Sequence, residues 1–150
     1  MKVLVADDDP VSRRLLQNYL QKWGYDVAVT TNGAEAWRMF EQEEFQMVIS
    51  DWMMPELDGL DLIRRIRQHP VDHYVYTILL TARSQKDDFV AGMDAGADDF
   101  VSKPFDQDEL HVRLRAGERI VNLELALKKK YQAMHDALSA PSPPDKAPAG

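Results

Sequence analysis

The stretch FQMVISDWMMP, residues 45–55, joins a short apolar run to a carboxylate and a loop that ends in proline. Apolar, β-branched runs of this length are typical of strands buried on both faces, as in parallel sheets. Asp51 then stands where the strand's carboxyl end meets solvent, and in open α/β sheets this rim binds ligands. An aspartate that merely opens a turn fits the same position. The other strand ends decide between the two interpretations.

Four further stretches have strand character, and helical patterns alternate with them. The predicted strands cover residues 2–6, 26–30, 76–81 and 99–102 beside the one that ends at Asp51. The predicted helices run from Pro10 to a stop at Gly24, from a turn at Asn32-Gly33, over 59–68, over 85–95, and from Asp106 onward. Asp9 is a suitable cap for the first helix. Because parallel neighbours need helical crossovers, the pattern predicts a flavodoxin-like doubly wound (βα)5 parallel sheet, strand order 2-1-3-4-5.

Charged and hydroxyl residues stand at the carboxyl ends of these strands. Asp7 and Asp8 follow the first strand, Asp51 ends the third, Thr81 ends the fourth and Lys103 follows the fifth. In a parallel sheet these ends share one rim, and the predicted order makes the first and third strands neighbours. Carboxylates that meet there repel one another and raise one another's pKa unless a cation joins them. A hard divalent ion with oxygen ligands is therefore expected, and Mg²⁺ is the predicted cofactor.

The composition excludes several classes of function. With 150 residues, 45% of them hydrophobic, the chain is expected to form one soluble domain. A formal net charge of −7 disfavours a direct nucleic-acid partner, and the absence of cysteine excludes disulfides, zinc thiolates and thiol nucleophiles. No apolar stretch approaches the ~20 residues of a membrane span, and no signal peptide precedes the first strand, so a cytoplasmic location is expected.

Five motifs together resemble those of bacterial two-component response regulator receiver domains, of which the chemotaxis response regulator is the simplest relative. The motifs are VLVADDDP, VISDWMMPELDGL, LLTA, GADDF and KPF, in the order and spacing of that family. The resemblance implies that Asp51 accepts a phosphoryl group from a sensor histidine kinase or a phosphotransfer protein, without a separate catalytic domain. It also implies the roles of the other residues: Mg²⁺ ligation by Asp7, Asp8, Asp51 and the backbone carbonyl of Met53, phosphoryl contacts from Thr81 and Lys103, and a switch formed by Thr81 and Phe100.

Three positions are notable within this resemblance. Met53 and Arg83 lie two residues after Asp51 and Thr81, beside the path of a water that would hydrolyse the acyl phosphate, so the lifetime of the phosphorylated state stays open. Phe100 replaces the commoner tyrosine and lacks its hydroxyl. The family's loop also predicts a cis peptide bond between Lys103 and Pro104, although cis bonds make up only about 5–6% of X-Pro bonds.

A second resemblance belongs to another class of protein. VLVADDDPV is similar to the first motif of haloacid dehalogenase-type phosphatases, with Asp7 as nucleophile and Asp9 as general acid. In that interpretation the acidic pair Asp98-Asp99 precedes Lys103 instead of following it, no cap domain is present, and Asp51 has no role. The receiver interpretation is therefore preferred.

The chain continues beyond the receiver-like residues 1–117. Over residues 118–139 apolar side chains recur at helical spacing, and the stripe is Ile120, Leu123, Leu127, Tyr131, Met134 and Leu138. We expect this extension to pair with a second copy as a coiled coil, with possible reciprocal ion pairs from Asp98 and Asp99 to Arg113. Residues 140–150 are proline-rich and are expected to be a disordered tail or linker. Parts of the extension resemble connectors to diguanylate cyclase or phosphatase effector domains, so the chain is expected to be either a natural single-domain regulator or a piece of a longer protein with an effector domain.

Overall fold

The computed structural model describes residues 1–82 and 86–139, with the side chains of 86–88 left aside. Its elements, in chain order, are β1 (Lys2–Ala6), α1 (Pro10–Lys22), β2 (Asp26–Thr30), α2 (Gly33–Gln42), β3 (Met47–Asp51), α3 (Gly59–Gln68), β4 (Tyr76–Thr81), α4 (Lys86–Ala95), β5 (Asp99–Ser102) and α5 (Gln107–Ser139). The alternation of strands and helices predicted from the sequence is confirmed. The predicted helix start at Gln85 and the predicted tail at 140–150 lie outside the described residues.

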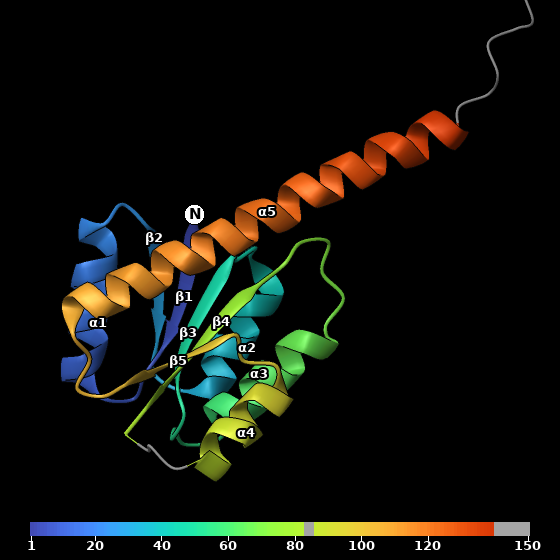
Figure 1. The fold of residues 1–150 in the computed structure, drawn as a ribbon. Helices are drawn as coiled ribbons and strands as arrows, with labels where there is room; N and C mark the ends of the chain where they lie inside the picture. Colours follow the sequence, from blue (N-terminus) through green and yellow to red (C-terminus); the bar gives the residue numbers. More distant parts are fainter. Residues whose placement is uncertain (83–85, 140–150) are drawn as a thin grey trace, which may run out of the picture.

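The five strands form one parallel sheet in the order β2-β1-β3-β4-β5, as predicted. Helices α1 and α5 cover one face of the sheet, and α2, α3 and α4 cover the other (Figure 1). All strands run in the same direction, so their carboxyl ends share one rim. The order of the strands changes direction between β1 and β3, which places the switch point of the topology between these two strands.

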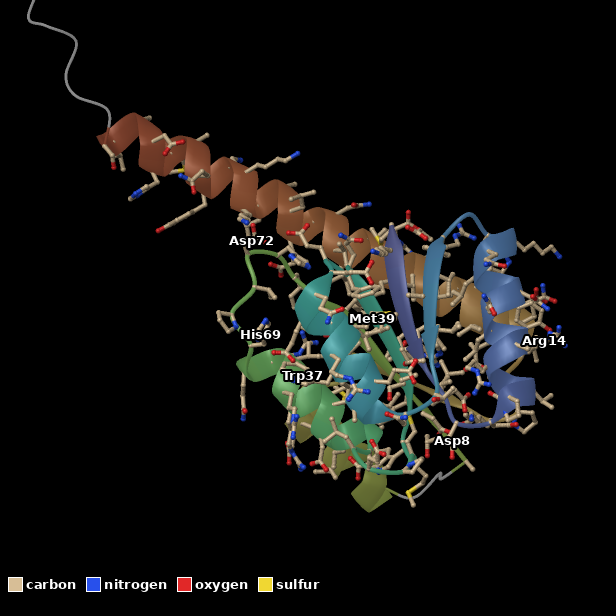
Figure 2. The ribbon with its side chains drawn as sticks, turned by 180° about the vertical axis from the view of Figure 1, so that it is seen from behind. Asp8, Arg14, Trp37, Met39, His69 and Asp72 are labelled. Carbon is tan, nitrogen blue, oxygen red and sulfur yellow. The ribbon has the colours of Figure 1, made fainter. Side chains whose placement is uncertain are left out.

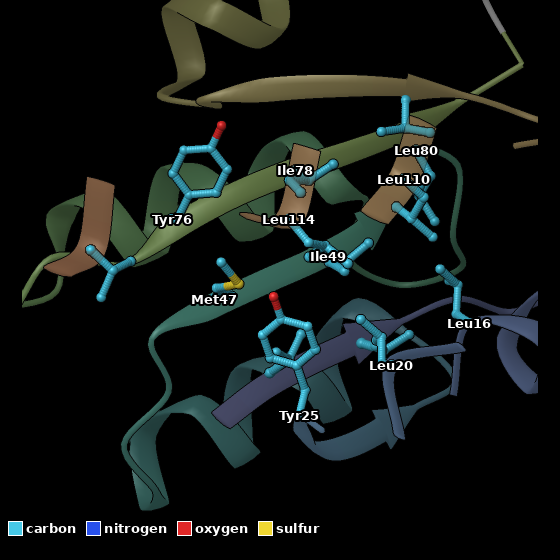
Figure 3. Packing of buried hydrophobic residues seen from close by; sticks show 14 residues of the cluster. Leu16, Leu20, Tyr25, Met47, Ile49, Tyr76, Ile78, Leu80, Leu110 and Leu114 are labelled. Atoms are coloured by element: carbon cyan, nitrogen blue, oxygen red, sulfur yellow. The ribbon is translucent and has the colours of Figure 1, made fainter. Parts of the chain in front are cut away.

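Alternate side chains of each strand fill different hydrophobic clusters, because successive residues of a strand point to opposite faces. Ile49 and Ile78 pack under α1 and α5, together with Leu110 and Leu114 of α5 (Figure 3). Val48 and Leu79 point to the opposite face and pack with residues of α2, α3 and α4. Burial on both faces explains why β1 and β3 are apolar almost up to their polar ends.

Side-chain caps fix where α1, α2 and α3 begin, and the cap of α3 is Asp58. Asp9 accepts a hydrogen bond from the backbone N–H of Val11 at 3.1 Å, as predicted for the cap of α1. Asn32 likewise accepts from Glu35 at 2.8 Å and caps α2. The predicted turn at Asn32-Gly33 was therefore wrong: Asn32 is the cap and Gly33 is the first residue of the helix. Turn residues and cap residues share the same short polar side chains, so the dipeptide alone does not distinguish them.

Helix α5 begins at the rim with the carboxyl ends and runs past the amino ends of the strands, where its last turns leave the body (Figure 1). Its buried residues are Leu110, Leu114, Gly117 and Val121. The predicted apolar stripe lies in solvent, with Leu123 68% and Leu127 64% exposed. Near the point of departure, Lys128 donates to the backbone carbonyl of Asp72. Figure 2 shows that Asp72 and Asp8 lie at opposite ends of the globular body. Among the described residues, no helix has the length and apolar character to cross a membrane.

Candidate functional site

Three carboxylates from two neighbouring strands converge at the carboxyl rim of the sheet. Ala6 pairs with Ser50 in the register of β1 and β3, so the next residues, Asp7 and Asp51, stand side by side. One carboxylate oxygen from each of Asp7, Asp8 and Asp51 lies within 4.8 Å of the others. Asp7 is fully buried, Asp51 is half-buried and Asp8 is exposed. The cluster is therefore open to solvent on the side of Asp8.

Lys103 brings a positive charge to this cluster from β5. Its Nζ lies 2.9 Å from Oδ2 of Asp51 and 3.0 Å from Oδ2 of Asp7. The backbone N–H of Lys103 donates to the carbonyl of Thr81 at 2.9 Å, which continues the pairing of β5 with β4 to the rim. The peptide bond between Lys103 and Pro104 is cis, as predicted. One ammonium group thus bridges the two most buried carboxylates.

Burial and neighbouring charges act in opposite directions on the central groups. Burial raises the pKa of Asp51, and the hydrogen bond and charge of Lys103 partly offset this rise, while Asp7 adds to it. Burial lowers the pKa of Lys103, but its hydrogen bonds to Asp51 and Asp7 outweigh that effect and the pKa is raised. Lys103 therefore stays charged. A cation is held beside a carboxylate that burial alone would drive toward its neutral form.

Backbone contacts hold Asp51 and Asp7 in place, and sequence reasoning missed them. A β-carbon on Gly59 would lie 2.2 Å from the carbonyl oxygen of Asp51, so the first turn of α3 can approach only because Gly59 has no side chain. The backbone N–H of Asp9 donates to Oδ1 of Asp7 at 3.0 Å. Arg13 donates to the backbone carbonyl of Asp7 at 2.9 Å. The sequence signals for these supports are the Asp-Gly pair at the start of α3 and the arginine one turn into α1.

The other residues predicted for the site lie around the carboxylate cluster, some next to Asp51 and others farther from it. Thr81 is buried at the end of β4, one residue past the partner of Asp51 in the sheet register. Phe100 is the second residue of β5, farther from the rim than Lys103, and its ring packs against that of Trp52 with centroids 6.4 Å apart. The side chain of Met53 is exposed, and its backbone carbonyl as a metal ligand stays a prediction. Arg83 lies outside the described residues.

The donor set suits a hard divalent cation. All three converging groups are carboxylates, and Mg²⁺ and Ca²⁺ prefer oxygen ligands. Mg²⁺ usually keeps several waters and binds one or two carboxylates with phosphate oxygens, which fits a cluster that is open on one side. The residues present therefore fit a magnesium ion, while a soft metal that prefers thiolate finds no ligand in a chain without cysteine.

Comparisons with known proteins agree on one family. The response regulator receiver domain family matches residues 3–115. The transcriptional regulatory protein TrcR of Mycobacterium tuberculosis is 40% identical over 115 residues, which cover 77% of this chain and 44% of TrcR. The receiver domain of the Francisella response regulator 1452 superposes with a TM-score of 0.73 and 32% identity, covering 79% of this chain and 96% of that structure.

The curated relatives, and one of the solved structures, are longer than this chain. A probable two-component system response regulator/GGDEF domain protein has a TM-score of 0.76 and 28% identity, covering 81% of this chain and 50% of that structure. The chain spans about half the length of the curated relatives it matches, from 44% to 53% of each. The shared part is the one that carries the five strands and the carboxylate cluster.

Proposed function

This chain belongs to the response regulator receiver domain family, and on that premise we propose that Asp51 accepts the phosphoryl group. The chain is a receiver domain of two-component signal transduction. The donor that we propose is a sensor histidine kinase or a phosphotransfer protein with a phosphohistidine. Receivers of this kind act as signalling modules, and we propose that this one works in the cytoplasm and that transfer to Asp51 needs no separate catalytic domain.

The observation that carries the assignment is the position of Lys103 over the carboxylate of Asp51, 2.9 Å away. Asp51 is the only carboxylate of the cluster that combines partial exposure with a direct ion pair. Asp7 also pairs with Lys103 but is fully buried, and Asp8 is exposed without that ion pair. An attacking carboxylate needs access to phosphorus and a positive charge to offset the repulsion between anions.

The chemistry that this arrangement supports is a direct transfer. A carboxylate oxygen of Asp51 attacks phosphorus, the bond from phosphorus to the donor's imidazole nitrogen breaks, and an acyl phosphate forms. Mg²⁺, held by Asp7, Asp8, Asp51 and the carbonyl of Met53, would supply charge neutralisation when it is bound. Lys103 would turn from the carboxylates to the phosphoryl oxygens as a flexible point charge.

Thr81 and Phe100 are the residues that we propose for the response to phosphorylation. Thr81 stands on the strand next to Asp51, where its hydroxyl is a suitable donor to a new phosphoryl oxygen. Phe100 is a half-buried residue of β5, and its ring packs against that of Phe89 on α4 with centroids 4.9 Å apart. A shift of Thr81 toward the phosphoryl group would change the space open to that ring.

Phosphorylation by a small donor tests the proposal. The protein is incubated with acetyl phosphate and Mg²⁺, and its intact mass is measured. We expect the mass of one phosphoryl group on the natural chain and on Asp26→Asn, an exposed matched control at the start of β2. We expect none on Asp51→Asn or in the presence of EDTA. Labelling of Asp51→Asn to the natural extent would overturn the assignment, and turnover of a generic phosphate ester would favour the dehalogenase-type phosphatase.

The exposed stripe of α5 supports a second proposal, that two copies pair through this helix. Six large side chains at helical spacing lie in solvent between residues 120 and 138, and the last turns of this stretch have left the body. Surface of this kind is typically covered by a partner. The relatives that are twice as long, one of them named as a GGDEF domain protein, support the further proposal that such a helix joins the receiver to an effector domain.

A further inference from the structure

Gly92 lies in the interior of α4, where glycine destabilises a helix relative to alanine. Its backbone does not adopt the positive φ that glycine alone adopts readily, unlike Gly24 and Gly96. Gly92 is buried, so the fold has a reason other than backbone conformation to place glycine here. The side chains that pack against Gly92, chiefly Phe100, give that reason.

The end of the Phe100 ring fills the space that a side chain on Gly92 would need. A β-carbon on Gly92 would lie 2.3 Å from Cζ and 2.6 Å from Cε1 of Phe100, and 3.2 Å from Cδ1 of Leu79. Contacts below 3.0 Å are not found for real side chains, so alanine at this position requires the ring to move. The backbone of α4 at Gly92 thus forms a slot for the ring.

The same ring lies between two other aromatic side chains. On one side is Trp52, which follows Asp51 directly, is 6% exposed and has its ring centroid 6.4 Å from that of Phe100. On the other side is Phe89 of α4, with centroids 4.9 Å apart and 53% of its surface in solvent. Three rings therefore connect the residue beside Asp51 to the solvent-exposed surface of α4.

We propose that Gly92 is a positioning residue for Phe100, and that its slot keeps the row Trp52, Phe100 and Phe89 in contact so that events at Asp51 reach the surface of α4. This inference rests on the proposed phosphorylation of Asp51 for its second half only. The packing of the ring against Gly92 stands without it. Gly92→Ala displaces the ring, exposes Trp52 and weakens the response of α4.

Fluorine NMR on the full chain tests the packing directly. The protein contains three tryptophans, Trp23, Trp37 and Trp52, so labelling with 5-fluorotryptophan gives three signals. Gly92→Ala is expected to move the Trp52 signal at least three times further than the other two, which serve as internal controls. In a Phe100→Ala background, where no ring fills the slot, Gly92→Ala is expected to move Trp52 by less than a third of that shift.

The outcomes of this comparison separate the ring from a general effect of alanine in α4. A folded Gly92→Ala protein with an unmoved Trp52 signal, or with the same shift in both backgrounds, overturns the proposal. Should Gly92→Ala unfold the natural chain but not the Phe100→Ala chain, the clash with the ring is supported. Unfolding in both backgrounds shows that Gly92 serves something other than Phe100 and overturns it.

A second experiment tests the connection from Asp51. Because the chain has no cysteine, Met93→Cys, 43% exposed on α4, takes a single trifluoromethyl label. Beryllofluoride with Mg²⁺ is the probe, and the label's shift is compared at equal saturation in chains with Gly92 and with Gly92→Ala. We expect the shift to fall at least threefold in Gly92→Ala. An equal shift, or no shift in the chain that keeps Gly92, overturns the connection.

The two proposals fail in distinguishable ways. If acetyl phosphate does not label Asp51, the proposed function is wrong, and the fluorotryptophan comparison still decides the packing of Phe100 against Gly92. If acetyl phosphate phosphorylates the natural chain but not Asp51→Asn, the proposed function stands. The shift of the trifluoromethyl group on α4 then tests Gly92 alone.

Discussion

Lys103 Nζ lies 2.9 Å from Asp51 Oδ2, although Lys103 follows β5 and Asp51 ends β3, with β4 between them. The lysine stem crosses the end of β4 to reach the carboxylate, and the same ammonium also lies 3.0 Å from Asp7. A single cation therefore stands where a metal ion would meet the same carboxylates. We expect the two cations to compete for these oxygens, and such competition can be measured.

Replacement of Lys103 by methionine is expected to slow phosphorylation and tighten metal binding. The transfer loses a positive charge that offsets repulsion between anions, so we expect labelling by acetyl phosphate to slow at least about tenfold. The carboxylates lose a competing ammonium, so the apparent dissociation constant for Mg²⁺ should fall. Lys128→Met, at the far end of the molecule, is the matched control. Weaker Mg²⁺ binding in Lys103→Met would contradict the competition.

Two glycines are expected to respond very differently to alanine. At Gly59 the new β-carbon would lie 2.2 Å from a backbone oxygen of Asp51, which cannot rotate away, so we expect a loss of about 3 kcal/mol in the free energy of unfolding. At Gly24 nothing lies within 4 Å, and only the φ of 89° opposes a side chain, with a cost of about 1 kcal/mol. Urea titrations compare the two. Equal losses would mean that α3 shifts freely away from β3.

Replacement of Ser12 by alanine is expected to stabilise the fold. It is 8% exposed on α1, and its Oγ has no hydrogen-bond partner among the described residues. An unpaired buried hydroxyl loses its contacts with water, so Ser12→Ala should raise the free energy of unfolding by about 1 kcal/mol. Ser50 is the contrasting position, because its Oγ donates to the carbonyl of Asp51 at 2.9 Å and Ser50→Ala should destabilise the fold. A loss of stability in Ser12→Ala would show that its hydroxyl is paired in solution.

Most of this site could be predicted from the sequence, because each apolar strand ends at a polar residue and strands alternate regularly with helices. Asp7, Asp51, Thr81 and Lys103 each terminate or follow an apolar run, and strand order alone brings them to one rim. Contacts that depend on three-dimensional packing were not predictable in this way. Gly92 has no local signal, since the ring that fills its slot lies on another element. Asp98 was expected to pair between copies, but within one chain it binds Arg67 at 2.7 Å.

Arg113, the expected partner of Asp98 and Asp99 in a second copy, also has its ion pairs within one chain. Within one chain Arg113 lies 2.8 Å from Asp99 and 3.2 Å from Glu109. Charge pattern indicates which residues attract one another but not whether the partner belongs to the same chain. A pairing between copies through these residues would have to replace contacts that already exist within each copy. The apolar stripe of α5 is therefore the stronger basis for a dimer.

Strongly alkaline solution is expected to destabilise the fold through three tyrosines. Burial is the largest cause that raises the pKa of Tyr25, Tyr74 and Tyr76, the last to about 12, and the carboxylates of Glu118 and Asp98 add to it for Tyr25 and Tyr74. Above about pH 10 the unfolded chain loses these protons while the folded chain keeps them, so stability falls as pH rises. Below that pH these groups contribute no slope.

Each such proton contributes at most about 1.4 kcal/mol per pH unit. Tyr25→Phe should therefore make the fall between pH 10 and 11.5 shallower in urea titrations. Tyr131→Phe, at a 70% exposed position on α5, is the matched control for the substitution itself. An unchanged slope in Tyr25→Phe would mean that its phenol titrates alike in both states.

Two copies of the chain are expected to associate through α5, and the structure shows which change to this helix tests that best. A chain that ends at Gly117 would lose more than the stripe, because Val121 is buried against the body and Glu118 accepts a hydrogen bond from Tyr25 at 3.0 Å. Substitution on the exposed part of the helix is the cleaner comparison. Leu127 is 64% exposed and belongs to the stripe, while Ala126 is exposed one residue earlier, about 100° around the helix.

Leu127→Glu places a charge where a partner helix would bury an apolar side chain worth about 1.5–3 kcal/mol, so we expect it to shift a dimer toward monomers. Ala126→Glu adds the same charge outside the stripe and should leave the dimer intact. Lys130 interrupts the stripe at one turn, which favours a moderate affinity that sedimentation at tens of micromolar can resolve. If the natural chain and Leu127→Glu both sediment as monomers, with and without beryllofluoride, the stripe does not serve self-association and its partner must be a different helix.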